Sequence, residues 1–346
     1  MAILLRWRRD TAANWTSNNP ILAQGEPGFE TDTGKYKIGN GSTAWNSLSY
    51  GQFSSSAIAG LFTDQVSGSD PTAPASSKLL VYAKSIAGRM MLKQIDSIGE
   101  HTPLQPILAR NKVGYWNPPG NFTTLPGVFG YTAPTTVGTT TAAVVATTNL
   151  FTRMRRLSFI STATAGSLSS FRVATAPVTM GDGHGNGGFY KIIRFGCSDP
   201  ATVSGARQFC GVSSNTGAPT NVEPNTLLNC IGVGHGAADT SLSIFYGGSV
   251  AQAPIILGSN FPANTLSTDA YELALFAPST AACIYYEITR INTGDVATGV
   301  IVTDGAAIVL PAFTTLLTYS WNFRTNNATA LSVGLDVMSD YIETDN

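Results

Sequence analysis

From about residue 120 onward, short segments in which hydrophobic and polar residues alternate recur along the sequence, and this pattern predicts β-strands. The clearest case runs from Leu331 to Val337, where every second residue is apolar, as in a half-buried strand. Comparable segments lie at residues 242–246, 271–275 and 284–288. Gly, Pro, Asn and Asp residues bound these segments, which favours an antiparallel β-sandwich of the jelly-roll kind over residues 120–346. The sequence contains no repeat of roughly 20–30 residues, so a parallel β-helix is disfavoured.

Residues 6–50 show a tighter pattern that predicts a small β unit. Two strands flank a turn in which Gly34 can supply the positive φ that closes a hairpin. The strands are expected at Phe29–Thr31 and Tyr36–Ile38. Asn40 and Gly41 predict a second tight turn. Trp15 and Trp45 are available to cover a core that is too small to be stable alone.

The region between these two parts, residues 52–119, is expected to contain a linker and a β-rich neck. Ser, Ala and Pro dominate residues 51–77, which predicts an extended linker with one helical turn at 57–62. Residues 77–98 fit either a helix of a trimeric coiled coil or two strands that are separated at Gly88. Gly88 weakens a helix, and apolar residues cover too much of its circumference, so two strands are favoured.

Composition excludes several classes of function. Charged residues make up only 12% of the chain, compared with roughly 25% in an average soluble domain. The net charge of −1 and the lack of a basic stripe give no electrostatic footprint for nucleic acid. A hydrophobic content of 43% argues against disorder. Neutral polar surfaces of this kind are typical of proteins that pack against their own copies or bind sugars.

The cysteines and the termini set the expected environment. No Cys-x-x-Cys pair is present, so zinc is not expected, and the cysteines are predicted to be small buried residues in a reducing cytoplasm. They are Cys197, Cys210, Cys230 and Cys283. The first residues contain no secretory signal, and no apolar run reaches 18 residues, so membrane insertion is not expected.

No constellation of residues predicts catalysis, a cofactor or a metal. The glycine-rich string around His184 lacks the features of a phosphate or calcium loop, and it is interpreted as a flexible surface loop. His101 is expected in a turn or at the surface. Glycoside hydrolysis needs two carboxylates at a set separation. Acids that remain open for this role are Glu223, Asp239, Glu272 and Glu287. A second acidic group is interpreted as an exposed terminus: Asp336, Asp340, Glu343 and Asp345.

Sugar binding needs less than catalysis, because aromatic rings can stack on a sugar while neutral polar groups around them form hydrogen bonds. Four aromatic residues near predicted loops or strand ends are the candidate receptor-binding residues, although aromatic residues more often lie in a core. They are Tyr246, Phe261, Trp321 and Phe323.

Four ordered motifs lie within the first 45 residues: Arg8-Arg9-Asp10-Thr11-Ala12-Ala13 before Trp15, Gly25-Glu26 before Gly28, Thr31-Asp32-Thr33-Gly34-Lys35, and Ile38-Gly39-Asn40-Gly41-Ser42-Thr43-Ala44-Trp45. Together they resemble the N-terminal module of phage major tropism determinants, which several phage tail-fibre and tail-associated hyaluronidase proteins share. In that family the module is a trimeric attachment or shaft element at the virion-proximal end. Asp10 replaces a more usual Gly, and Asn40 replaces an Asp, and both turns tolerate the change.

Later stretches also resemble phage tail fibres. Residues 81–106 are similar to the mid-sections of such fibres. Residues 199–236 and 335–345 look like the C-terminal adhesin domains of phage and prophage tail fibres.

The resemblance implies a homotrimeric phage tail fibre, or receptor-binding protein, that is made in the bacterial cytoplasm and resides in the virion. Residues 1–51 would attach to other tail or baseplate proteins, 52–119 would form the linker and neck, and 120–346 would bind a host receptor, a surface glycan or a protein. Three sites on one fibre would act by avidity. Two alternatives stay open: a tail-borne polysaccharide depolymerase or hyaluronidase, and a structural adaptor without host contact.

Overall fold

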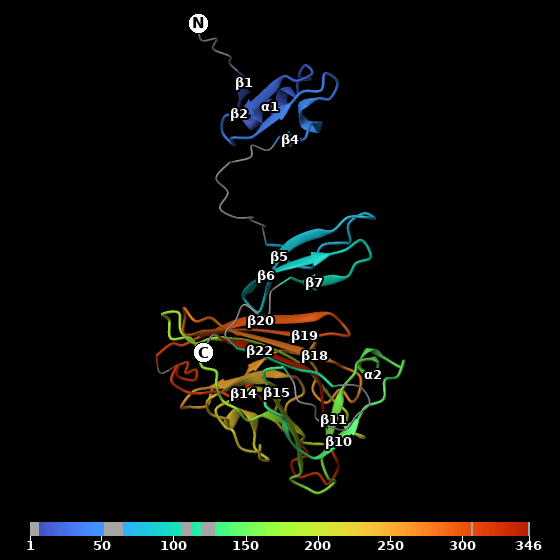
Figure 1. The fold of residues 1–346 in the computed structure, drawn as a ribbon, viewed down its shortest axis with the longest axis vertical. Helices are drawn as coiled ribbons and strands as arrows, with labels where there is room; N and C mark the ends of the chain where they lie inside the picture. The colour runs from blue at the N-terminus through green and yellow to red at the C-terminus, as the bar shows by residue number, and fades with distance from the viewer. Residues whose placement is uncertain (1–6, 52–64, 105–111, 119–128, 306, 345–346) are drawn as a thin grey trace. The chain divides into compact units, whose positions relative to one another are not determined.

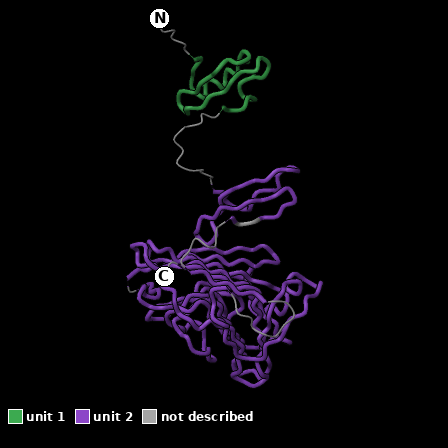
Figure 2. Tube along the Cα trace, in the orientation of Figure 1, with its two compact units in different colours: residues 1–63 green, residues 64–346 purple. Residues whose placement is uncertain are grey.

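The computed structural model describes residues 7–51, 65–104, 112–118, 129–305 and 307–344. The chain forms two compact units, residues 1–63 and residues 64–346 (Figure 2). Strands dominate both units, and the predicted all-β class is confirmed (Figure 1). The expected helical turn at 57–62 lies outside the described residues. No described helix has the length and apolar character that would let it cross a membrane.

The first unit is a four-stranded sheet with one short helix. The strands lie side by side in sequence order: β1 (Arg8–Asp10), β2 (Pro27–Glu30), β3 (Tyr36–Ile38) and β4 (Tyr50–Gly51). The predicted hairpin is confirmed in β2 and β3, and Gly34 has the expected positive φ of 69°. Gly41 also has positive φ, at 78°, as the second turn required.

The core of this unit consists of Trp15, Leu22 and Trp45. The two indole rings are stacked, with their centroids 4.1 Å apart, so the expected role of the tryptophans is confirmed. Trp15 lies on helix α1 (Ala12–Asn18), which the sequence pattern did not predict. The hydroxyl of Thr11 accepts a hydrogen bond from the backbone N–H of Asn14 and caps this helix.

The second unit begins with a three-stranded sheet, which we call the neck sheet. Its strands are β5 (Leu80–Ile86), β6 (Arg89–Ile95) and β7 (His101–Pro103), in that order. Ala87 and Gly88 connect β5 to β6, and both have positive φ, 46° and 71°, as a two-residue hairpin turn requires. The strand interpretation of residues 77–98 is therefore confirmed, and the coiled-coil helix is wrong.

The rest of the second unit is a sandwich of two antiparallel sheets. The β22 sheet contains β8 (Lys112–Trp116), β10 (Thr139–Ala142), β11 (Leu157–Ile160), β13 (Phe189–Cys197), β18 (Tyr271–Ala277), β19 (Cys283–Arg290), β20 (Asp295–Val302) and β22 (Gly334–Thr344). The β21 sheet contains β9 (Thr135–Val137), β12 (Leu168–Val173), β14 (Arg207–Ser213), β15 (Cys230–His235), β16 (Ser243–Gly247), β17 (Ile255–Ile256) and β21 (Ser320–Thr325).

The main hydrophobic core lies between these two sheets. The remaining regular elements of the described residues are helix α2 (Leu150–Arg153) and the 3₁₀ turns η3 (Pro224–Thr226) in the second unit and η1 (Trp45–Ser47) in the first. Strand β8 pairs with β22, although the sequence had assigned residues up to 119 to the neck. All four cysteines are buried free thiols, as expected of small core residues.

Strand β22 corrects two expectations from the sequence. It is not half-buried, because both of its faces are covered: Leu335 and Val337 lie in the main core, and Asp336 on the other face is buried against Arg156. The acidic residues of this segment are likewise not an exposed terminus. Each described one is buried and has a basic partner: Asp336 with Arg156, Asp340 with Lys191, and Glu343 with Arg89. Asp345 lies outside the described residues.

A second buried ionic network surrounds Arg324 in the sandwich interior. The guanidinium forms a two-pronged ion pair with Asp199 and donates hydrogen bonds to Gln208 and to Nε2 of His235, 3.0 Å away. Because arginine only donates, Nε2 must accept, so Nδ1 carries the proton and donates to the Gly236 carbonyl. Burial and the neighbouring guanidinium lower the pKa of His235 to about 3.

The depressed pKa of His235 predicts sensitivity to acid. Below the ordinary histidine pKa of about 6.5, His235 is protonated in the unfolded chain but stays neutral in the folded chain. The free energy of unfolding therefore falls as the pH falls. In His235→Gln this loss should be smaller by up to about 1.4 kcal/mol per pH unit between about pH 6 and pH 4, measured by urea unfolding. His184→Gln, at an exposed position, should keep the wild-type slope. Equal slopes in all three proteins would contradict the proposed state of His235.

Candidate ligand cleft

The turn of the neck hairpin contacts the outer face of the β22 sheet, the face turned away from the sandwich core. Strand register places Tyr190, Phe276 and Tyr285 in one row across β13, β18 and β19 on this face. Ring centroids are 6.2 Å apart in the first pair and 6.1 Å apart in the second. The guanidinium of Arg89 lies 4.7 Å from the Tyr190 ring centre and forms an ion pair with Glu343. These contacts combine charge pairing with cation–π attraction.

Two further contacts fix the turn. The backbone N–H of Ala87 donates to Oε2 of Glu287, at 3.1 Å. Gly88 lies against the Tyr285 ring so closely that a Cβ atom at this position would be 2.3 Å from a ring carbon. Only glycine allows this approach, and its positive φ of 71° also favours glycine.

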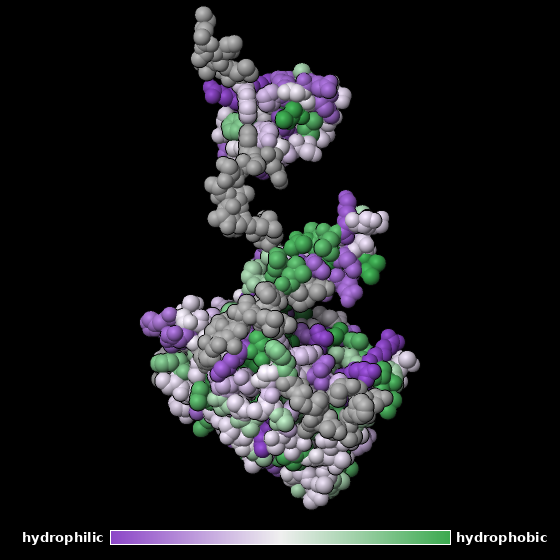
Figure 3. Space-filling view, in the orientation of Figure 1, coloured by the Kyte–Doolittle hydropathy of each residue, from purple (hydrophilic) through white to green (hydrophobic). Residues whose placement is uncertain are grey.

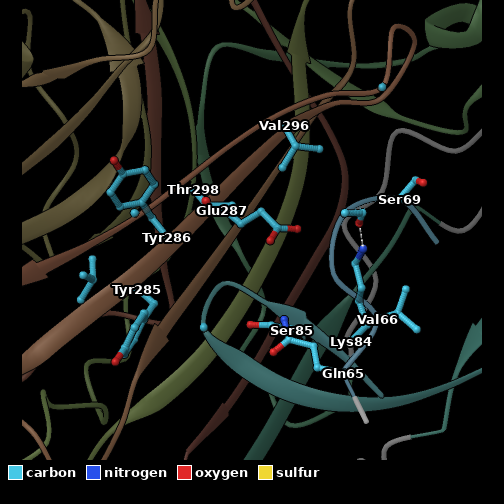
Figure 4. A pocket seen from close by; sticks show the side chains of 15 residues that line it. Gln65, Val66, Ser69, Lys84, Ser85, Tyr285, Tyr286, Glu287, Val296 and Thr298 are labelled. Atoms are coloured by element: carbon cyan, nitrogen blue, oxygen red, sulfur yellow. Dashed lines mark hydrogen bonds between the residues drawn. The ribbon is translucent and has the colours of Figure 1, made fainter. Parts of the chain in front are cut away.

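A cleft of about 790 Å³ lies beside this contact, between the neck segment and the β22 sheet (Figure 4). The sheet wall is formed by outward-facing side chains of β19 and β20, with the Tyr286 ring nearby in the interior. The opposite wall comes from the segment before β5 and from β5 itself. Residues that line the cleft include Tyr285, Glu287, Val296, Thr298 and Val300 on the sheet wall and Gln65, Lys84 and Ser85 on the neck wall.

Glu287 is the acidic group of this cleft (Figure 4). Its pKa is raised by burial, an effect that the hydrogen bond from the Ala87 N–H partly opposes. No basic side chain lies within ion-pair distance of Glu287 among the residues the structure describes, whereas neighbouring Glu272 is paired with Arg194. A half-buried carboxylate without a counter-ion retains a strong capacity to accept hydrogen bonds from a ligand.

Lys84 is the basic group of the cleft. Its ammonium donates to the carbonyl of Gly68, and it lies 3.6 Å from a carboxylate oxygen of Asp70. Asp70 is also paired with Lys93, at 2.7 Å. One carboxylate therefore serves two ammonium groups, and Lys84 keeps donor capacity on the neck wall of the cleft.

The aromatic residues that the sequence suggested for receptor binding do not form a site. Trp321 and Phe323 are buried in a cluster with Phe209 that packs against Val222 and Leu227 of the β14–β15 connection. Phe261 belongs to the main core. Tyr246 is half-buried and packs against the same core. Buried rings cannot stack on a ligand, so Trp321, Phe323 and Phe261 are corrected to core residues. The role of Tyr246 stays a prediction.

The other candidate residues are also dispersed. His184 is exposed in its loop, and His101 is exposed with Nδ1 at 2.8 Å from the Tyr82 hydroxyl. Glu223 is paired with Arg207, and Asp239 accepts from the backbone N–H of Gly236. Within the described ranges, no group of three or more His, Cys, Asp and Glu side chains is placed to hold a metal ion.

Of the acids that sequence analysis kept open for catalysis, only Glu287 lines the cleft. The pattern of β19 contained part of this signal, because outward Tyr285 and Glu287 alternate with the buried Ile284, Tyr286 and Ile288. The neck wall had no such signal, since it meets β19 from about 200 residues away in the sequence.

Comparison with family models gives a match in the first unit. The family model of the major tropism determinant N-terminal domain matches residues 5–43, which is most of the first unit. The chain thus has the N-terminal module of phage tropism determinants, consistent with a phage tail fibre. No curated protein matches the sequence.

The solved structures that are similar to this chain include lectins and a protein of unknown function. Peanut lectin is 14% identical with a TM-score of 0.43, and the match covers 67% of this chain and 97% of the lectin. Lectin II from Ulex europaeus is 12% identical with a TM-score of 0.43, over 69% and 100% of the two chains. A protein of unknown function from Shewanella oneidensis MR-1 is 12% identical with a TM-score of 0.41, over 70% and 90%. At these identities the likeness concerns the fold alone.

The burial of Phe323 predicts a large effect on stability. Phe323→Ala should lower the free energy of unfolding by about 3–5 kcal/mol, because it leaves a cavity beside Phe209 and Trp321. Phe313→Ala, where the ring is 56% exposed, should change it by less than about 0.5 kcal/mol. Similar effects of the two substitutions in urea unfolding would contradict the core position of Phe323.

The contact between Gly88 and Tyr285 predicts that Gly88→Ala detaches the hairpin turn from the sheet. Hydrogen exchange measured by mass spectrometry should become faster over residues 85–90. Gly258→Ala is the matched control, because Gly258 also has positive φ, nothing lies within 4 Å of its added Cβ, and it lies outside the neck hairpin and the cleft lining. Unchanged exchange over residues 85–90 in Gly88→Ala, or the same increase there in Gly258→Ala, would contradict this role of the contact.

Proposed function

We propose that this protein is a phage tail fibre that attaches the virion to the bacterial surface. The observation that carries the proposal is the tropism-determinant module at residues 5–43, joined to a separately folded β-sandwich unit. The first unit would bind other tail or baseplate proteins. The sandwich unit would bind a surface glycan, and the cleft at Glu287 is its best-formed site. The protein would reside in the virion after synthesis in the host cytoplasm.

We further propose that the fibre is a homotrimer, and the neck sheet supports this. Alternation along β5 and β6 places Val81, Met90 and Leu92 on one face of the neck sheet, where they are 37%, 52% and 42% exposed. Figure 3 shows hydrophobic side chains gathered on this hairpin. The opposite face carries the polar cluster of Lys84, Lys93 and Asp70. A small sheet with a bare apolar face gains stability when copies of the chain cover that face.

Attachment by such a fibre needs no chemistry, and we propose none. Three identical sites on one fibre raise the effective concentration of each site near the cell surface. Avidity of this kind can exceed the affinity of a single site by roughly 10²- to 10⁴-fold. A weak sugar site is therefore sufficient for firm adsorption.

The function is tested by binding of the fluorescently labelled full chain to a panel of bacterial strains, with the surface glycan analysed before and after incubation. Saturable binding to some strains with an intact glycan is the expected result. Shortened glycan chains would instead establish a depolymerase. If the chain binds none of the strains, the alternative of a structural tail adaptor without host contact is favoured.

The proposed trimer predicts a mass of about 109 kDa in light scattering, three times the 36.3 kDa of one chain. Leu92→Lys should dissociate the trimer, because it introduces three charges into an apolar contact. Leu316→Lys, at a position that is 54% exposed elsewhere on the chain, should leave the mass unchanged. A wild-type mass of one chain, or a trimeric Leu92→Lys variant, would contradict this assembly.

A further inference from the structure

We propose that the cleft at Glu287 selects an uncharged, hydroxyl-rich sugar ring and rejects sugars that carry a carboxylate. This inference rests on the proposed attachment to a surface glycan, and it adds the chemical class of the ligand.

The two charged groups of the cleft have opposite hydrogen-bonding capacities. The Glu287 carboxylate on the sheet wall can only accept, and the Lys84 ammonium on the neck wall can only donate. A hydroxyl group both donates and accepts, so one ligand with several hydroxyls can satisfy both walls. A sugar ring with adjacent hydroxyls has this property, whereas a hydrocarbon would leave both charges unsatisfied.

The remaining lining is uncharged and fits the two kinds of surface that a sugar ring presents. Thr298, Ser85 and Gln65 offer hydroxyl and amide groups for further hydrogen bonds. Val296 and Val300 offer apolar surface for the C–H face of a ring, and Val296 is 54% exposed and Val300 48% exposed. The volume of about 790 Å³ lies within the range of roughly 300–1,000 Å³ that small-molecule sites occupy.

The absence of a counter-ion at Glu287 decides against an acidic ligand. In the same unit, Glu272, Glu343 and Glu223 each have an arginine partner. Glu287 has no such partner among the described side chains, so its charge acts on whatever enters the cleft. A carboxylate on the ligand would face this charge in a partly desolvated site, where repulsion between like charges is stronger than in water. Lys84 and Lys93 also act on Glu287, but neither forms an ion pair with it, and burial has the larger effect on the pKa of its carboxyl.

The hairpin turn of the neck holds the Glu287 side chain in the cleft. The same carboxylate that faces the cleft accepts the Ala87 N–H through Oε2, so Glu287 is held in place by the neck. Glutamine at this position can still accept this hydrogen bond through its carbonyl oxygen but has no charge. Glu287→Gln therefore separates the effect of charge from the effect of position.

The test uses saturation-transfer difference NMR on the full chain with single sugars as probes. Glucose, galactose and mannose are the uncharged probes, and glucuronic, galacturonic and mannuronic acid are their respective acidic counterparts. We expect the wild-type protein to bind at least one uncharged sugar tenfold or more tightly than its matched uronic acid. Glu287→Gln should reduce this preference to threefold or less, mainly through tighter binding of the uronic acid.

The matched control is Glu223→Gln, which removes an arginine-paired carboxylate of the same unit that lies outside the cleft lining. It should keep the wild-type preference. Equal binding of neutral and acidic sugars by the wild-type protein, an unchanged preference in Glu287→Gln, or no transfer to any uncharged sugar would each overturn the inference. Binding of the labelled chain to bacterial strains is scored separately: if it persists in these cases, only the ligand class or its site is wrong, and if it also fails, so does the proposed function.

Discussion

The contact between the neck hairpin and the outer face of the β22 sheet determines what the second unit can do. The turn at Ala87 and Gly88 places backbone against the ring of Tyr285, which is possible because glycine has no side chain there. Arg89 then lies over Tyr190, and Glu343 compensates the loss of its hydration. Without this contact the neck and the sandwich would share no wall, and the cleft would be open sheet surface.

The same contact sets the electrostatic character of the cleft. Most buried acids of the sandwich are matched with an arginine or lysine inside the fold, as in the pairs Arg324 with Asp199 and Lys191 with Asp340. Glu287 receives a backbone N–H from the neck in place of a cation. This hydrogen bond holds the Glu287 side chain but does not neutralise its charge. The half-buried carboxylate can therefore still accept hydrogen bonds from a ligand. The function that we propose uses this residual charge for selectivity and the number of fibre arms for strength.

Local sequence patterns predicted the elements whose structure depends on nearby residues. The hairpin around Gly34 and the two strands that meet at Gly88 follow from turn chemistry within a few positions. The alternation in β18 and β19 likewise appears in the structure as one inward and one outward face. In these segments, nearby residues are enough to predict both the strand and the position at which it ends.

The features that could not be predicted depend on residues far apart in the chain. The acids of β22 looked like an exposed terminus because their partners Lys191, Arg156 and Arg89 lie 149, 180 and 254 positions away. Trp321 and Phe323 appeared accessible because the β14–β15 connection that covers them has no apolar pattern of its own. The two walls of the cleft are also far apart along the chain, since Ala87 and Glu287 are separated by 200 residues.

The most direct test of the account is hydrogen exchange of the full chain, measured by mass spectrometry with and without surface glycan from a bacterial strain that the chain binds. The account predicts slower exchange on glycan addition in the two walls of the cleft, residues 84–88 and 285–300. Slower exchange confined to other segments, such as residues 214–229, with none in the cleft walls, would show that the receptor binds elsewhere on the sandwich.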